Sequence, residues 1–274
     1  MAEVVVDRPI TIATVSGKGG VGKTAVTIGT AMALRDLGYR VGIIDLDLES
    51  SSLGDVLGVT RDNLVMTEKI EPVEVHGLKA VSLSLFPQED WVDVPTLIEE
   101  ERVYALVGQM FKSVNWGELD FLCVDFPPGT GSELRALIRQ RVHGLILVAA
   151  AQRVSELPVR RLVRMAREEY RLNILGVVSN NPYNVDGADS GKAISERYSL
   201  PLLATIRWDR SIAEAMDNRT AMDVTPFQPI AKALQGYFFP EPKPKAQART
   251  KRKQPSKPKA TRRSRKPKGD QNAD

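Results

Sequence analysis

Close to the start of the 274-residue chain stands the octapeptide Gly17-Lys18-Gly19-Gly20-Val21-Gly22-Lys23-Thr24. Its spacing is that of a phosphate-binding loop, G-x-x-x-x-G-K-S/T, with an additional lysine directly after the first glycine. Residues 10–15 before it are β-branched and apolar, which predicts a buried strand. Residues 25–37 after it have apolar residues at helical spacing and precede Gly38, which predicts a helix that ends at this glycine. A strand, a glycine-rich loop and a helix in this order form the context in which such a loop binds phosphate groups.

Each position of the octapeptide has a physical reason in a loop that binds a nucleotide. Its four glycines let the backbone adopt conformations that a side chain forbids and let it approach a polyphosphate closely. The loop N–H groups and the N-terminus of the helix then point at the anion. Lys23 provides a positive charge for the β- and γ-phosphates, and Thr24 provides a hydroxyl for Mg²⁺. A glycine-rich turn with two unrelated lysines is the alternative, but it explains neither the spacing nor the flanking pattern. We therefore predict that residues 17–24 bind nucleotide.

The composition limits the class of protein. The chain has one cysteine, Cys123, which excludes a disulfide framework and a cysteine-only metal site within one chain. Such cysteine usage is typical of a reducing cytoplasm. Residues 1–7 lack the pattern of a signal peptide, and the longest strongly apolar run, residues 145–151, is far shorter than the roughly 18 residues of a membrane span. We expect a soluble, cytoplasmic protein without a transmembrane segment.

Charge divides the chain into two parts. Residues 241–274 contain 13 Lys and Arg residues against 3 Asp and Glu residues, and they contain no large apolar side chain. We therefore expect a globular nucleotide-binding domain over residues 1–240 and a disordered basic tail over residues 241–274. The tail could contact nucleic acid nonspecifically, which we favour over an anionic membrane surface, or it could serve solubility alone.

Short apolar runs alternate with amphipathic stretches along the globular part. Further strands are expected at residues 40–45, 121–125, 144–149, 174–179 and 202–206, with a hairpin or short strand near 78–85. Helices are expected at residues 96–113, 153–171, 188–199, 210–218 and 227–238. This alternation predicts an α/β fold, a P-loop NTPase with a doubly wound, mostly parallel sheet and helices on both faces. In such a fold ligands bind at the carboxyl ends of the strands.

Carboxylates follow two of the predicted strands and would meet the phosphate loop at this edge of the sheet. Asp125 is placed to hold a Mg²⁺ ion together with Thr24, and its alternative role is to cap the next turn. Gly129, in the Pro-Pro-Gly turn that follows, can reorient its N–H at low cost and so sense the γ-phosphate. Either Asp45 or Asp47 would orient the attacking water or a metal-bound water, and we favour Asp47.

Two motifs carry a resemblance to a known family. The octapeptide resembles the deviant Walker A motif of the ATPase superfamily that contains ParA, MinD, ArsA and the nitrogenase iron protein. Residues 125–131, Asp-Phe-Pro-Pro-Gly-Thr-Gly, resemble the DxPPGTG segment of Mrp-type ATPases, also called ApbC, which are associated with iron–sulfur cluster transfer. Residues 116–120, 174–180 and 206–215 support the resemblance, which covers about residues 9–238.

The resemblance implies an ATP-dependent homodimer in which ATP joins the two subunits. The residue at Lys18 would reach across the interface to the phosphates of the partner, while Lys23 and Thr24 would act within their own subunit.

The same resemblance implies roles for three residues that follow strands. Asp47 matches the switch I aspartate, and Asp125 matches the aspartate on the Mg²⁺ side. Asn180 matches the asparagine that recognises adenine, and an amide offers the base both a donor and an acceptor. The alternative for Asn180 is a turn cap, which the following Asn181-Pro182 favours.

The chain departs from the family where a cluster is held. Mrp-type carriers have a CxxC pair after the asparagine-bearing strand, whereas residues 181–187 contain no cysteine. The thiolates that an iron–sulfur cluster requires are therefore missing. Cys123, in a predicted apolar strand, is interpreted as a small buried hydrophobe. Ser132 also replaces the acidic residue that commonly follows PPGTG.

We therefore expect a slow, Mg²⁺-dependent ATPase that uses ATP to switch a dimer between two states. The first hypothesis places it in iron–sulfur cluster handling with a protein client, with cluster ligands lost or borrowed. The second is a positioning or partition switch of ParA or MinD character, whose basic tail touches DNA or an anionic surface in one nucleotide state. A third is a regulatory ATP-binding partner of another enzyme. Trp91, Trp116 and Trp208 are too scattered in the sequence to predict a base-stacking platform.

Overall fold

The computed structural model describes residues 9–47, 52–63, 65–82, 85–86, 99–129, 131–140, 142–150, 156–181 and 189–240. These residues form an α/β fold around an eight-stranded sheet with the strand order β10-β9-β8-β1-β7-β2-β6-β5. The strands are β1 (Ile10–Val15), β2 (Val41–Asp45), β5 (Val73–Val75), β6 (Leu78–Ser82), β7 (Phe121–Asp125), β8 (Gly144–Ala150), β9 (Ile174–Asn180) and β10 (Leu202–Ile206). Neighbouring strands run parallel, except that β5 and β6 form an antiparallel hairpin. A small separate sheet pairs β3 (Val65–Met66) with β4 (Ile70–Glu71).

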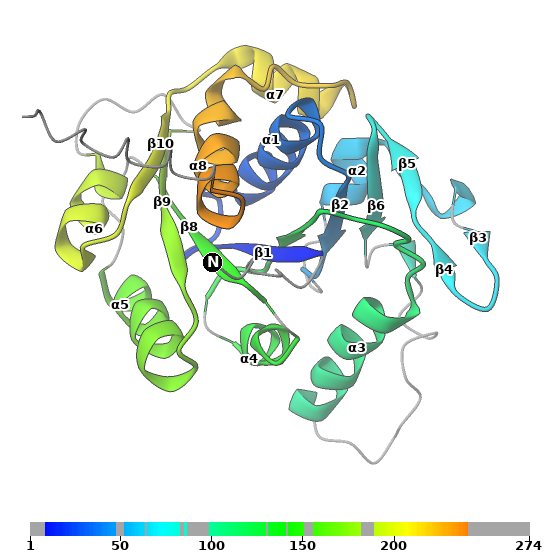
Figure 1. The fold of residues 1–274 in the computed structure, drawn as a ribbon, viewed down its shortest axis with the longest axis horizontal. Helices are drawn as coiled ribbons and strands as arrows, with labels where there is room; N and C mark the ends of the chain where they lie inside the picture. Colours follow the sequence, from blue (N-terminus) through cyan, green and yellow to red (C-terminus); the bar gives the residue numbers. More distant parts are fainter. Residues whose placement is uncertain are drawn as a thin grey trace, which may run out of the picture. The chain divides into compact units, whose positions relative to one another are not determined.

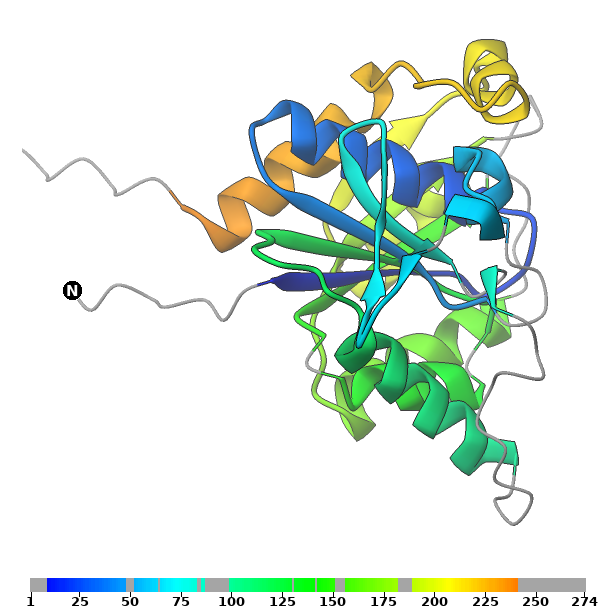
Figure 2. The same ribbon diagram turned by 90° about the vertical axis from the view of Figure 1, so that its right-hand side faces the viewer.

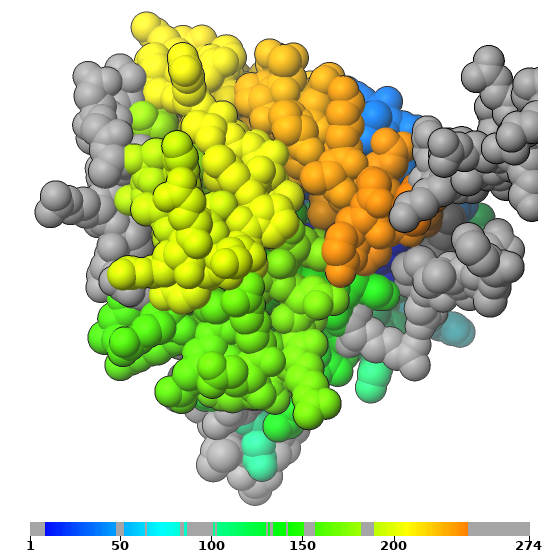
Figure 3. Space-filling view, turned by 60° about the vertical axis from the view of Figure 1, so that its left-hand side comes forward, coloured from blue at the N-terminus to red at the C-terminus, as the bar shows by residue number. Residues whose placement is uncertain are grey.

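Helices cover both faces of the large sheet (Figure 1). They are α1 (Lys23–Asp36), α2 (Leu53–Leu57), α3 (Glu99–Ser113), α4 (Ser132–Ile138), α5 (Glu156–Arg164), α6 (Ser190–Tyr198), α7 (Arg210–Asp217) and α8 (Gln228–Phe238). Figure 2 shows α1 and α8 on one side of the sheet and α3, α4 and α5 on the other. In the space-filling view of Figure 3, the yellow residues of the α6–α7 region lie between the green α5 region and the orange α8.

The sheet is buried on both faces, which explains why its strands are nearly continuous apolar runs. Every residue of β1, β2, β7, β8 and β9 is buried. One apolar cluster packs Leu34 of α1 and Leu234 of α8 against one face. A second cluster packs Met110 of α3, Leu134 of α4 and Leu162 of α5 against the other. The predicted doubly wound, mostly parallel sheet is therefore confirmed.

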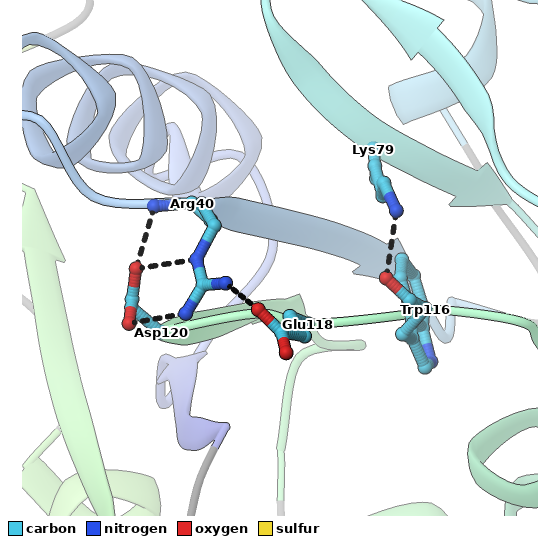
Figure 4. A network of polar contacts seen from close by, with 5 residues as sticks. All are labelled: Arg40, Lys79, Trp116, Glu118 and Asp120. Atoms are coloured by element: carbon cyan, nitrogen blue, oxygen red, sulfur yellow. Dashed lines mark hydrogen bonds and ion pairs between the residues drawn. The ribbon is translucent and has the colours of Figure 1, made fainter.

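A polar network fixes the edge of the sheet at which β2 and β7 begin (Figure 4). The Asp120 carboxylate accepts hydrogen bonds from the backbone N–H of Arg40 at 3.0 Å and from its guanidinium Nε at 3.1 Å. Glu118 pairs with the same guanidinium. Lys79 Nζ donates to the carbonyl of Trp116 at 2.8 Å. These contacts lie at the opposite ends of the strands from the phosphate loop, so they serve the fold.

Some expected features differ in detail or lie beyond the described ranges. The helix expected at 153–171 is α5 followed by a π-helical turn, Met165–Glu169. The hairpin or short strand expected near 78–85 corresponds to β6, whose hairpin partner β5 precedes the expected range. The expected disorder of residues 241–274 falls outside the described residues, so it stays a prediction together with the boundary at residue 240. None of the helices in the described ranges combines the length and apolar character that crossing a membrane requires.

Candidate functional site

The predicted phosphate loop connects β1 to α1, as the sequence indicates. Gly20 and Gly22 have φ angles of 72° and 82°, a left-handed conformation that glycine adopts without steric cost. Gly22 stands at the N-terminus of α1 and has no side chain with which to cap it. Ser16, the residue after β1, stabilises the loop, because its Oγ donates to the Lys18 carbonyl at 2.8 Å. The loop therefore directs the start of a 14-residue helix toward whatever anion it holds.

The threonine of the loop is bonded to the carboxylate at the end of β7. Thr24 Oγ1 donates to Asp125 Oδ2 at 2.6 Å, and Thr27 Oγ1 lies 3.2 Å from Asp125 Oδ1. Thr24 Oγ1 is also 3.3 Å from the hydroxyl of Ser52. The contact between Thr24 and Asp125 spans 101 positions of sequence, and it brings together the two residues predicted to share a metal.

Burial and a neighbouring carboxylate make Asp125 an unusual acid. It is 4% exposed, and its strand neighbour in the β2–β7 register is Asp45. Burial first, and the negative charge of Asp45 second, raise the pKa of Asp125 to about 7, although the hydroxyls of Thr24 and Thr27 and the charge of Lys23 act in the opposite direction. A buried carboxylate bonded to a hydroxyl fits one side of a divalent cation, since Mg²⁺ takes one or two carboxylates and completes its shell with phosphate oxygens and water. Among the described residues, no three His, Cys, Asp or Glu side chains converge as a dedicated metal cage.

Asp45 and Asp47 have different surroundings. Asp45 is fully buried, and its carboxylate accepts hydrogen bonds from the backbone N–H of Asp47 at 2.9 Å and of Leu53 at 3.1 Å. It therefore ties the chain after β2 to the start of α2. Asp47 is partly exposed and lines the cavity beside the loop. This arrangement favours Asp47 as the carboxylate that faces a ligand.

A cavity of about 560 Å³ opens beside the phosphate loop. Of the predicted nucleotide-binding residues, the following line it: Gly19, Gly20, Gly22, Lys23, Thr24, Asp47 and Asn180. Asp125 lies behind Thr24, and Val21 is buried. Lys18 is exposed and stands outside the lining. Gly129 has a φ angle of 106° and donates its N–H to the Ser16 carbonyl at 3.0 Å, so in this structure the Pro-Pro-Gly turn is bonded to the residue that follows β1.

Asn180 connects the loop to the far half of the cavity. It is 6% exposed, and its Nδ2 donates to the Val21 carbonyl at 2.8 Å. The side chain thus bonds to the phosphate loop across 159 positions of sequence. Its bond reaches a distant segment of the chain, which supports a place in the site over the alternative of a turn cap.

The sequence interpretation missed the other wall of the cavity. This wall comes from the end of β10, the loop after it and α7, and it includes Ile206, Arg207, Trp208, Ile212 and Met216. Its signal in the sequence is weak, because it consists of ordinary apolar residues and one tryptophan after a predicted strand. Residues 206–215 supported the family resemblance, but no residue of this stretch was given a role in the site.

Known proteins resemble the chain over nearly all of its described part. A family-level sequence profile described as ParA, NUBPL iron-transfer P-loop NTPase, matches residues 8–238. The "Iron-sulfur cluster carrier protein" of Saccharolobus solfataricus is 36% identical over 220 residues, which cover 75% of this chain and 73% of that protein. The protein of the same name from Aquifex aeolicus is 33% identical over 81% of this chain, which spans 64% of that longer protein. The "Cytosolic Fe-S cluster assembly factor CFD1" of Saccharomyces cerevisiae is 30% identical over 77% of this chain and 78% of its own length.

Solved structures agree on the fold. A nucleotide-binding protein in complex with ADP from Archaeoglobus fulgidus superposes with a TM-score of 0.64 and 24% identity, over 77% of this chain and 86% of that one. The cell division ATPase MinD of Pyrococcus furiosus gives a TM-score of 0.63 and 23% identity, over 84% of this chain and 99% of that one. At these identities the likeness concerns the fold alone.

Proposed function

The chain belongs to the ParA family of P-loop NTPases, in the group described as NUBPL iron-transfer P-loop NTPase, and on this premise we propose that it is a Mg²⁺-dependent ATPase acting as a dimeric switch. The observation that carries the proposal is the hydrogen bond between Thr24 and Asp125 beneath a left-handed glycine loop that opens into the cavity. This arrangement supplies backbone donors, a lysine, a hydroxyl and a carboxylate at one point, which is the set that phosphoryl transfer to water requires.

Each residue contributes to positioning and charge. The loop N–H groups and the Lys23 ammonium bind the β- and γ-phosphates and stabilise the charge that develops on them. Three residues would hold Mg²⁺: Thr24, Asp47 and Asp125. Thr24 and Asp125 would do so through the pair that they already form, and Asp47 would reach the ion from the cavity wall. When bound, this ion supplies positive charge to the phosphate oxygens. Asp47 accepts a hydrogen bond from the attacking water and orients it toward the γ-phosphate.

A comparison of the two lysines of the loop tests the proposal. Lys23 is 9% exposed and lines the cavity, so Lys23→Ala should weaken ATP binding about 30-fold or more, measured by titration calorimetry. Unchanged ATP affinity in this variant would refute the phosphate-loop assignment.

Lys18 is the matched control and tests the dimer. Because Lys18 is exposed and outside the cavity lining, Lys18→Ala should retain ATP affinity. If Lys18 reaches the phosphates of a second subunit, the same variant should no longer dimerise when ATP is added, measured by light scattering. A normal ATP-dependent dimer would exclude the role across the interface.

The names of the relatives support a role in iron–sulfur cluster handling. We propose that a partner provides the cluster ligands, because the chain itself lacks the thiolates. The chain has a single cysteine, Cys123, which is 4% exposed within β7. Burial raises the pKa of its thiol to about 12, which keeps it protonated and unsuited to bind iron. Protein purified without oxygen should therefore carry no stoichiometric iron or acid-labile sulfide by itself. Stoichiometric iron and sulfide would contradict the proposal that a partner provides the thiolates.

A second candidate function is a positioning or partition switch, which the basic segment 241–274 favours. Its 13 Lys and Arg residues would bind the phosphate backbone of DNA with strong salt dependence. Removing residues 241–274 should retain ATP hydrolysis and abolish salt-sensitive retention on DNA. Equal DNA binding by the shortened chain would exclude this candidate.

A further inference from the structure

A second cavity lies at the opposite edge of the sheet from the phosphate loop, where β1 and β7 begin. Its volume is about 890 Å³, against about 560 Å³ for the cavity beside the loop. Its lining comes from Thr11 of β1, Leu122 of β7, one face of α3 and the residues after α4 (Figure 1). We call it the α3 cavity. It shares no lining residue with the proposed nucleotide cavity, so a ligand bound here would be a second ligand of the protein.

The middle of α3 has a glycine where the helix lines this cavity. Gly108 is buried within a helix of 15 residues, and a glycine in a helix interior lowers helix stability relative to alanine. Packing does not require it, because a Cβ at this position would meet one atom within 4 Å, the Nε2 of the flexible Gln140 side chain at 3.4 Å. Gly108 therefore gives up helix stability at a point where a larger side chain would fill the cavity.

A buried donor without an acceptor stands at one end of the α3 cavity. Trp116 follows the end of α3 by three residues and is 8% exposed, and its Nε1 has no hydrogen-bond partner among the residues that the structure describes. The carbonyl of Trp116 accepts from Lys79, and Figure 4 shows the indole nitrogen on the side that points away from Lys79. An N–H that has lost water without gaining an acceptor is unfavourable, so an acceptor atom that enters the cavity and reaches it would be bound favourably.

The charged side chains of the described lining are all cations. Lys112 stands in the last turn of α3, close in sequence to Trp116. Arg139, after α4, lies over the ring of Tyr104, with 4.9 Å between its Cζ and the ring centroid. Tyr104 precedes Lys112 by two helical turns, about 12 Å along α3, so it marks the other end of the cavity. With no Asp or Glu in the described lining, this cavity favours a negatively charged ligand.

These features together indicate the class of ligand. We propose that the α3 cavity binds a small amphipathic carboxylate. One carboxylate oxygen accepts a hydrogen bond from Trp116 Nε1, and the Lys112 ammonium balances the charge. The apolar body of the ligand occupies the space beside Gly108 and extends toward Tyr104. The alternative is that Lys112 only offsets the negative end of the α3 dipole, and this alternative predicts no ligand.

Calorimetry of the full-length chain with two probes tests the proposal. Sodium decanoate, kept below its micelle concentration, has a carboxylate on an apolar chain, and decan-1-ol has the same chain without the charge. The wild type should bind one decanoate, and it should bind decan-1-ol at least tenfold more weakly, because a hydrogen bond to a charged group changes affinity about tenfold or more. Absence of decanoate binding, or equal affinity for the two probes, would overturn the proposal.

Two lysine variants locate the charge. Lys112→Gln should weaken decanoate binding about fivefold, because Lys112 is exposed and its charge is partly screened, and it should leave decan-1-ol binding unchanged. The matched variant Lys232→Gln removes the same charge from an exposed position of α8 and should bind decanoate like the wild type. Equal losses in the two variants would overturn the proposed site, because decanoate would then follow the net charge of the protein.

Two glycine variants locate the apolar body. Gly108→Leu fills the middle of the α3 cavity and should abolish decanoate binding, whereas Gly108→Ala adds one methyl group beside Gln140 and should retain it. Both substitutions replace a helix glycine by a better helix former, so thermal melting should show no loss of stability. Unchanged decanoate affinity in a folded Gly108→Leu protein would overturn the proposal.

The indole N–H of Trp116 gives a direct readout. A charge-assisted hydrogen bond to a carboxylate deshields the proton, so decanoate should move one indole signal downfield in a ¹H–¹⁵N spectrum. That signal should be absent from the spectrum of Trp116→Phe. Decanoate binding without this shift would contradict the assigned contact. Lys112→Gln should also retain its ATP affinity, since Lys112 lies outside the proposed nucleotide cavity, and failure of the carboxylate site would therefore leave the proposed function intact.

Discussion

The two ends of the proposed nucleotide cavity are built in different ways. The phosphate end comes from one continuous segment, the loop between β1 and α1, joined by Asp125. The base end is assembled from separate places, with Asn180 at the end of β9, Trp208 after β10 and Phe227 before α8. Phosphate binding needs backbone N–H groups at fixed spacing, which only a particular string of glycines allows. A planar base needs an apolar surface of the right shape, which many residues at many positions can supply. Sequence motifs therefore identify the first end residue by residue, whereas at the second end the family resemblance gave a role to Asn180 alone.

The largest effect that distinguishes the two ends is expected at Asp125. Asp125→Asn removes a charge from the phosphate end and leaves the base end untouched. It should lower the rate of Mg²⁺-dependent ATP hydrolysis about 100-fold, measured by phosphate release. The contribution of the base end to ATP affinity should remain. Hydrolysis at the wild-type rate would contradict this difference between the two ends, because the phosphate end would then not depend on its carboxylate.

The same substitution should not destabilise the protein without Mg²⁺. An asparagine can still accept a hydrogen bond from Thr27 and donate one to the Thr24 hydroxyl. It also removes the repulsion between Asp125 and Asp45 and the cost of burying a charge. The unfolding free energy of Asp125→Asn at pH 8 should equal or exceed that of the wild type, measured with urea in the presence of EDTA. A clear loss would show that the carboxylate serves the fold before it serves catalysis.

The second expected effect is a pH dependence of the unfolding free energy, which also arises at the phosphate end alone. In the unfolded chain the Asp125 carboxyl has its ordinary pKa of 3.8, and in the folded protein burial and Asp45 raise this pKa to about 7. Between these values the folded state binds more protons than the unfolded state. The unfolding free energy should therefore fall as the pH rises from about 4 to 7, by at most about 4 kcal/mol, and this group should cause no further loss above pH 7. Urea titrations of the wild type and Asp125→Asn across this range check it, and equal slopes would contradict the assignment.

The parts of the fold that the sequence predicted depend on local pattern. The strands of the sheet core are short apolar runs because helices cover both faces, so 121–125, 144–149 and 174–179 could be located from composition alone. The π-helical turn Met165–Glu169 could not, because it departs from an otherwise regular helical pattern. The short β3–β4 sheet has two residues in each strand, fewer than a periodicity can define.

The same distinction holds within the site. Asp125 was predictable because it ends an apolar strand and precedes a Pro-Pro-Gly turn. The separate roles of Asp45 and Asp47 were not, since only the structure gives Asp45 its partners at Asp47 and Leu53. Trp208 seemed one of three scattered tryptophans until β10 brought it to the cavity. Contacts that join distant segments have no local signal, and the base end consists almost entirely of such contacts.

The smallest expected effect concerns the base end. Asp209 should affect ATP affinity without contacting the base, because it caps α7 and so fixes the loop that carries Trp208. Asp209→Ala removes the cap, which costs about 1 kcal/mol of helix stability, and it lets the loop leave the arrangement that binds. Apparent affinity falls in proportion to the fraction of molecules in the binding arrangement, so Mg²⁺-ATP should bind about two- to fivefold more weakly by calorimetry.

Asp209→Asn retains an acceptor for the Ser211 N–H and should behave like the wild type. Tripolyphosphate should bind all three proteins equally, because the phosphate end is a continuous segment that holds its shape without α7. A matching loss for tripolyphosphate would mean that the two ends are mechanically coupled, and Asn180, which bonds Val21 of the loop from the end of β9, would then be the residue through which the coupling passes.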